Sequence, residues 1–136
     1  MAFLDDIGTY LAAASIPTES LTLGTNLFLG TRPDSPDTVV AVYETGGAAP
    51  QLQFGTSTKP GIETRGLQVV TRAVGYSTAE ALCTDVWSAL CLVDNETIGS
   101  TRYLLADPVQ SPFALDRDDR DRMLHVVNFL VSREVA

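Results

Sequence analysis

The chain has 136 residues, of which 45% are hydrophobic, and its 17 acidic and 9 basic side chains give a formal net charge of −8. This length and apolar content predict one folded domain over residues 1–136 and exclude an intrinsically disordered chain. The negative charge argues against a protein that holds nucleic acid by its phosphates, because such a protein needs a basic surface.

The first element is predicted to be a helix. Apolar side chains from Phe3 to Ala14 recur at helical spacing and form one stripe, which Pro17 ends. Asp5 and Asp6 stand where a secretory signal would carry positive charge, and no segment approaches about eighteen consecutive apolar residues. We therefore expect neither a secretory signal nor a membrane-spanning segment.

The next segment predicts two strands joined by a turn. Alternating leucines over residues 21–29 indicate an irregular strand with a bulge at Gly24. Two prolines and two aspartates over residues 33–37 favour a turn, since proline fixes φ and aspartate bonds its own backbone. The mostly apolar residues 38–44 then indicate a strand that pairs with the first one.

Residues 45–61 are rich in glycine, proline, serine and threonine and show no sustained periodicity. They predict a long loop, which in a compact domain is either mobile or used for binding. The candidate interface residues in this loop are Gln51, Gln53 and Phe54. After the loop, alternating side chains predict a strand over residues 66–74.

The second half of the chain predicts one helix and two strands. Ser77 and Glu80 match a capping box, which precedes an apolar face that runs to Val93. Residues 94–99 are expected to end the helix and turn the chain. The last two strands are predicted at residues 100–108 and 122–132.

The last strand has apolar side chains on both faces, with Val127 and Phe129 on one face and Val126 and Leu130 on the other. Such a strand usually lies in the middle of a sheet that is covered twice. Because only two helices are predicted, we hypothesise that another subunit supplies the second cover. A stable monomer in solution would count against this hypothesis.

A charged segment, "DRDDRDR" at residues 116–122, connects the last two strands. It suggests a cation site, but an EF-hand loop counted from Asp116 would place Val127 where the bidentate glutamate belongs. The interleaved arginines also neutralise the aspartates locally. We interpret the segment as a charged turn that faces solvent or a partner. Its candidate interface residues are Arg117, Asp118, Asp119 and Arg120.

No residue is predicted to be catalytic or to bind a cofactor or metal. The single histidine, His125, lies in the last strand with no cysteine or acid at ligand spacing. Cys83 and Cys91 are separated by about 12 Å along one helix, which is too far for a disulfide. They are interpreted as reduced core residues. No nucleophile-elbow, phosphate-loop or metalloprotease motif occurs.

Two stretches together resemble the minor capsid or tail terminator family of long-tailed, siphovirus-like bacteriophages. They are "LGTNLFLGTRPDSPDTVVAVYETGG" at residues 23–47 and "PFALDRDDRDRMLHVVNFLVSRE" at residues 112–134. Residues 65–90 between them are similar to the strand and helix of that family. The charged turn departs from the family pattern, because it has Asp118, Asp119 and Asp121 where the family often has a glycine.

The resemblance implies an α+β fold with a mainly antiparallel sheet of four to five strands and two helices packed on one face. It also implies a virion protein, assembled in the host cytoplasm as a ring that is typically a hexamer, at the head-proximal end of the tail. The implied partners are copies of the chain, the tail tube protein and the head-completion protein of the neck. Double-stranded DNA would pass through the lumen without specific binding.

Two alternatives remain open on the sequence. Another neck protein, such as a head-completion or tail-completion factor, would have the same composition and ring-forming character. A small-molecule-binding enzyme is disfavoured by the lack of clustered His, Cys or Lys side chains.

Overall fold

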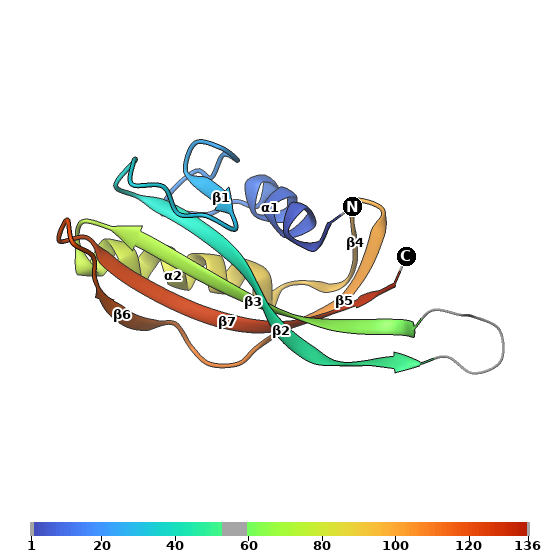
Figure 1. The fold of residues 1–136 in the computed structure, drawn as a ribbon. Helices are drawn as coiled ribbons and strands as arrows, with labels where there is room; N and C mark the ends of the chain where they lie inside the picture. Colours follow the sequence, from blue (N-terminus) through green and yellow to red (C-terminus); the bar gives the residue numbers. More distant parts are fainter. Residues whose placement is uncertain (1, 53–59, 136) are drawn as a thin grey trace.

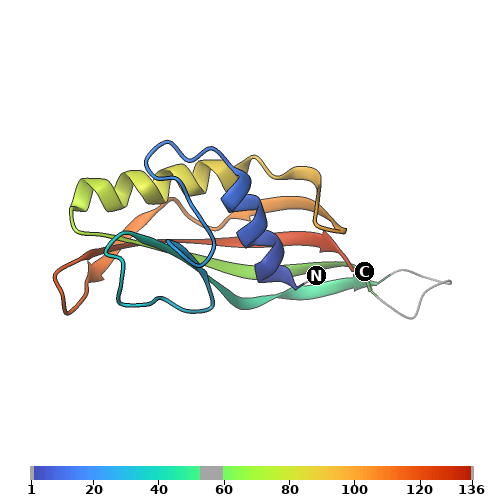
Figure 2. The ribbon, with the colours of Figure 1, turned by 90° about the horizontal axis from the view of Figure 1, so that it is seen from above.

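The computed structural model describes residues 2–52 and 60–135. In these residues seven strands form one curled sheet, and both helices lie on the same face of it (Figure 1 and Figure 2). The strands follow the order β1-β2-β3-β7-β5-β4, and β6 also pairs with β7. The elements are α1 (Phe3–Ala13), β1 (Leu27–Leu29), β2 (Val39–Leu52), β3 (Pro60–Ala73), α2 (Tyr76–Cys91), β4 (Asp94–Ile98), β5 (Thr101–Pro108), β6 (Phe113–Arg117) and β7 (Met123–Glu134). Neither described helix has the length and apolar character needed to cross a membrane.

The predicted α+β class is confirmed, but the predicted number of four to five strands is wrong. The sheet is mainly antiparallel, as predicted, with one parallel pair. β1 runs parallel to β2, so the sheet is mixed. β4 and β6 are strands where the sequence indicated a turn and a connection. Four of the five residues of β4 and all five of β6 are exposed. Neither strand therefore has the alternation of apolar and polar side chains that identifies a half-buried strand.

The predicted loop at residues 45–61 is wrong where the structure describes it. β2 continues to Leu52, and β3 begins at Pro60. Residues 45–52 of β2 and 60–66 of β3, here called the arm, pair with each other. β7 flanks the β3 side of the arm as far as Ile62, so only the ends of the two strands extend past β7 (Figure 1). The predicted loop residues are thus largely strand where the structure describes them, and residues 45–49 are exposed.

Glycines allow the two strands of this arm to approach each other. The register of β2 against β3 shifts between Thr45 and Ala48, as at a β-bulge. A Cβ atom at Gly47 would collide with the backbone of Thr64, and one at Gly66 would collide with Thr45. Glycine residues that favour a loop in the sequence are therefore required here for strand pairing.

The two helices form as predicted, but the capping box is wrong. α1 ends at Ala13, before Pro17. α2 begins at Tyr76, one residue ahead of the predicted cap, and no side chain caps its first turn. The carbonyl of Gly75 accepts the first helical hydrogen bond, from the Ala79 N–H at 3.0 Å. Ser77 therefore lies inside the helix, where it cannot act as the N-cap.

The last strand, β7, lies inside the sheet, as its two apolar faces predicted. β3 pairs with it along one edge, from Met123 to Glu134, and β6 and β5 share the other edge. On the helix side, Leu67, Val69, Val127 and Phe129 join both helices in one core cluster. Burial of each such side chain stabilises the fold by about 1.5–3 kcal/mol.

The opposite face of the sheet is closed in part by the chain itself. Val70, Leu124 and Val126 form a second buried cluster there. Further along the same face of β7, Leu130 is half-buried. The hypothesis that another subunit covers this face therefore does not hold for the first half of β7.

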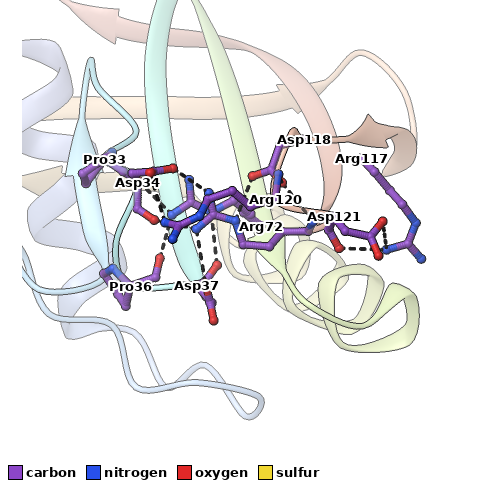
Figure 3. Close-up of polar contacts among 10 residues, drawn as sticks. Pro33, Asp34, Pro36, Asp37, Arg72, Arg117, Asp118, Arg120 and Asp121 are labelled. Carbon is purple, nitrogen blue, oxygen red and sulfur yellow. Dashed lines mark hydrogen bonds and ion pairs between the residues drawn. The ribbon is translucent and has the colours of Figure 1, made fainter.

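Arg72, which pairs in register with Leu124 of this second face, binds the loop of residues 33–37 (Figure 3). Its guanidinium donates to the carbonyl oxygens of Pro33, Pro36 and Asp37, at 2.7, 2.6 and 3.1 Å. Arg72 is only 2% exposed, and desolvation by burial, followed by the positive charge of Arg122, lowers its pKa. A buried guanidinium is tolerated because its donors are hydrogen-bonded. The bonds fix the turn predicted at residues 33–37 in one position against the sheet.

His125 lies on the helix side of β7 and is 1% exposed. Its ring packs edge-on against Tyr76, with the centroids 4.9 Å apart. Among the described residues, neither ring nitrogen of His125 has a hydrogen-bond partner. Desolvation by burial lowers the pKa of this histidine, although the nearby charge of Glu80 acts in the opposite direction. His125 is therefore neutral in the folded protein near neutral pH.

Acidification is expected to destabilise the protein through His125. Below the ordinary histidine pKa of about 6.5, the unfolded chain takes up a proton that the folded chain resists. The contribution of His125 is therefore fully present above that pH and is lost as the pH falls below it. Urea unfolding at about pH 7.5 and 5.5 should show a larger loss of unfolding free energy for the unsubstituted protein than for His125→Gln. Equal losses in the two proteins would contradict this assignment.

Arg72→Met is expected to lower the free energy of unfolding by about 3 kcal/mol, because three carbonyl oxygens lose a charged donor. Arg117→Met is the matched control. Arg117 forms an exposed ion pair with Asp121, and its loss should cost less than about 0.5 kcal/mol. Denaturant titration of both variants measures the difference. If the two variants unfold at the same denaturant concentration, Arg72 does not hold the loop.

Candidate functional site

The charged hairpin, residues 116–122, packs against the loop of residues 33–37 (Figure 3). The two sequence features that the family resemblance singled out therefore lie side by side. They come from opposite ends of the chain, and arginine side chains join them.

Arg122 is the centre of this contact, and its side chain is only 3% exposed. It donates to the carboxylate of Asp34 at 2.8 Å and to the carboxylate of Asp118 at 2.8 Å. It also donates to the backbone carbonyl of Asp34 and lies 3.3 Å from the carboxylate of Asp37. The sequence did not mark Arg122 as a candidate, because nothing in an alternating charged run distinguishes its one buried arginine.

Asp118 is bound inside the hairpin rather than presented to a partner. Its carboxylate accepts hydrogen bonds from the backbone N–H groups of Arg120 and Arg122, at 3.0 and 2.9 Å, in addition to the Arg122 side chain. Burial alone would raise the pKa of Asp118, but these donors lower it. Asp121 has a φ of 59°, in the left-handed region. An aspartate tolerates this conformation better than most residues.

Three of the predicted interface residues are exposed at the tip of the hairpin. Arg120 pairs with Asp34 at 3.0 Å, and 57% of its side chain is exposed. Arg117 pairs with Asp121 at 3.6 Å, and 44% of its side chain is exposed. Asp119 is also exposed. Exposed pairs of this kind contribute little to stability, so Arg117 and Arg120 can be used for recognition.

The other predicted interface residues lie elsewhere. Gln51 is in β2, opposite Ile62 of β3, at the end of the molecule away from the charged hairpin (Figure 1). Gln53 and Phe54 fall outside the described residues. The structure therefore does not bring the two predicted groups of interface residues together.

A second polar cluster, which the sequence did not reveal, anchors α1 near the base of the arm. The Tyr103 hydroxyl donates to Asp6 at 2.7 Å, and Arg133 donates to that hydroxyl at 3.1 Å and to Glu63 at 2.7 Å. Asp6 and Tyr103 are fully buried. Desolvation by burial, and then the bond to Asp6, raises the pKa of Tyr103. Asp6 sits one turn from Phe3 on the buried face of α1, which is the one signal that could have indicated a buried partner.

A groove of about 640 Å³ lies between the ends of α1 and α2, next to β4. Tyr10, Pro17 and Leu92 give it apolar walls, and Asp85 and Glu96 add carboxylates. The Asp85 carboxylate accepts the hydroxyl and the backbone N–H of Thr18, at 2.9 and 3.2 Å. The lining also holds Ser15 and Ser88. In the described residues the Asp85 carboxylate bonds Thr18 and neither of these serines, so the groove shows no activated nucleophile.

The remaining residues considered for chemistry are placed in the core or apart from one another. Cys83 is buried and Cys91 is half-buried, and both thiols are free. Burial raises the pKa of the Cys83 thiol to about 11, which leaves it protonated and unreactive. Within residues 2–52 and 60–135, no group of three or more His, Cys, Asp or Glu side chains could hold a metal ion.

Residues 5–135 match a family model described as bacteriophage tail terminator protein. A chain from a solved structure titled "Virion of native gene transfer agent (GTA) particle" has the same fold, with a TM-score of 0.68 and 21% sequence identity over 98% of this chain and 96% of that chain. No curated protein sequence matches. Because the family model covers almost the whole chain, this protein belongs to the bacteriophage tail terminator family.

Proposed function

We propose that this protein ends growth of a phage tail tube by forming a ring on its head-proximal end, and that the ring then provides the surface to which the head joins. The observation that carries this proposal is the family match over residues 5–135. Membership in that family makes the chain a structural protein of a phage-like tail. The position on the tube, the six copies in the ring and assembly in the host cytoplasm are parts of the proposal.

The charged hairpin supplies the surface that would meet the head-completion protein of the neck. Arg122 and Asp118 fix the backbone of the hairpin against the loop of residues 33–37. Arg117 and Arg120 can then be held in defined positions without contributing much to stability. Charges arranged in this way set the specificity and rate of docking more than its affinity.

The net charge of −8 fits a ring through which DNA passes. A lumen lined with carboxylates would repel the phosphates, so that double-stranded DNA would move through without being held. The tail tube protein would contact the opposite surface of the ring.

The variant Arg120→Glu tests the proposal, because Arg120 is exposed and lies outside β6. We expect it to fold and to limit tube length as the unsubstituted protein does, and to reduce head joining by tenfold or more. Tail tubes assembled with each protein are measured by electron microscopy and then mixed with filled heads. Arg102→Glu is the control, because Arg102 is an exposed arginine on β5 that bonds Asn95.

Two results would contradict the proposal. Tubes that grow to the same length with and without the unsubstituted protein would exclude tube termination. Binding to filled heads in the absence of tubes would instead favour a head-completion factor.

A further inference from the structure

We propose that copies of this chain join edge to edge, with the outer edge of the β2 arm of one copy pairing antiparallel with β6 of the next. The inference rests on the proposed ring and names the surfaces that would close it. The partner in this contact is a second copy of this chain.

The outer edge of the arm has no strand partner among the described residues. β1 pairs with β2 only from Val40 to Val42. From Tyr43 onward, the side of β2 that faces away from β3 is open. Residues 45–49, "TGGAA", are all exposed and carry no charged or bulky side chain. Soluble proteins usually protect an open edge with charge, proline, a bulge or a covering segment. Residues 45–49 have a bulge and are followed by Pro50, but they carry no charge and no described segment covers their outer edge.

β6 is a second open edge in the described chain. It pairs only with β7, and all five of its residues are exposed. Phe113 is 40% exposed and Leu115 is 56% exposed, and Val109 just before the strand is 59% exposed. Apolar side chains on an open strand edge are typical of a surface that another chain covers.

The placement of the two edges suits a head-to-tail contact. β2 lies on one side of the central β3-β7 pair, and β6 lies on the other. The arm and β6 also lie at opposite ends of the molecule (Figure 1 and Figure 2). A second copy can therefore be placed beside the first in the same orientation, shifted along the strand direction. In that position the β6 edge of the second copy lies next to the arm of the first.

The strand directions are consistent with this contact. β2 and β7 run the same way, because each is antiparallel to β3. β6 is antiparallel to β7 and therefore runs opposite to β2. The new pair would be antiparallel, so the sheet could continue from copy to copy. Two different surfaces meet in this contact, which gives a ring when the rotation between copies closes.

Paired cysteines test the contact. Facing residues of antiparallel strands have Cα atoms about 4.5–5.5 Å apart, which a disulfide can span. Four double variants combine Ala48→Cys or Ala49→Cys in the arm with Ala114→Cys or Leu115→Cys in β6. All carry Cys91→Ser, so that the remaining native cysteine is the buried Cys83. Each protein is assembled on tail tubes, oxidised and examined by denaturing gel electrophoresis.

We expect at least one double variant to give a ladder of covalent oligomers, while every single variant stays monomeric on the gel. Dimers from Ala48→Cys or Ala49→Cys alone would show that arms pair with arms, and would overturn the inference. Absence of cross-links in all four double variants would also overturn it. If the variants that give no cross-links still limit tube length, only the edge-to-edge contact is overturned and the proposed function stands. If the unsubstituted protein does not bind tubes, the proposed function is overturned as well.

Leu115→Lys gives an independent measurement. A charge on the β6 edge should weaken association between copies by about tenfold or more, measured from the mass of the particles at a series of concentrations. Leu92→Lys is the matched control, because Leu92 is a 75% exposed leucine at the end of α2. An equal effect of both substitutions on particle mass would contradict a specific role for β6.

Discussion

Two buried arginines hold the loop of residues 33–37 against the sheet, and much of the molecule depends on that contact. Arg72 donates to three backbone carbonyl oxygens of the loop. Arg122 binds the loop through Asp34 and the charged hairpin through Asp118. Arg72 pairs in register with Leu124, on the face of the sheet opposite the two helices, so the contact ties the loop to that face. It also turns a run of alternating charges into a hairpin of defined shape.

The stable and the open parts of the structure are separate. In the centre of the sheet, β3 and β7 have strand partners on both edges and are buried against the helices. Two of the open edges in the described residues are the β2 arm and β6, which lie at opposite ends of the molecule. The polar cluster of Asp6, Tyr103, Arg133 and Glu63 fixes α1 to the sheet near the base of the arm. A rigid body with open edges is what a subunit of a larger assembly requires.

The sequence predicted the elements that show a regular pattern of apolar side chains. It missed the elements that are held together by their backbone. The stripe of α1 and the two apolar faces of β7 were sufficient to identify both elements. The β2 arm was interpreted as a loop because glycine and alanine leave no side-chain pattern, although Gly47 and Gly66 are needed for the strands to approach. The capping box at Ser77 was misleading, since a matching local sequence does not determine where a helix begins.

The sequence predicted the charged turn of the candidate site, but not which of its residues bind one another. Alternating arginines and aspartates indicate an exposed turn, and Arg117, Asp119 and Arg120 are exposed. Sequence alone could not show that Arg122 is buried, nor that Asp118 is bound within the hairpin. These outcomes depend on the loop of residues 33–37, which is far away in the chain. The family resemblance named the two stretches but did not predict their contact, which Arg120 and Arg122 make through Asp34.

Hydrogen–deuterium exchange tests the central claim, that assembly pairs the open edges of the β2 arm and of β6 in a sheet that is already formed. Backbone amides of residues 45–49 and of Phe113–Arg117 are compared in the free protein and in the protein bound to tail tubes. The account predicts that both segments become protected together on assembly, while amides of β3 and β7, which already have partners, change little. Exchange that is the same in both segments before and after binding would contradict it.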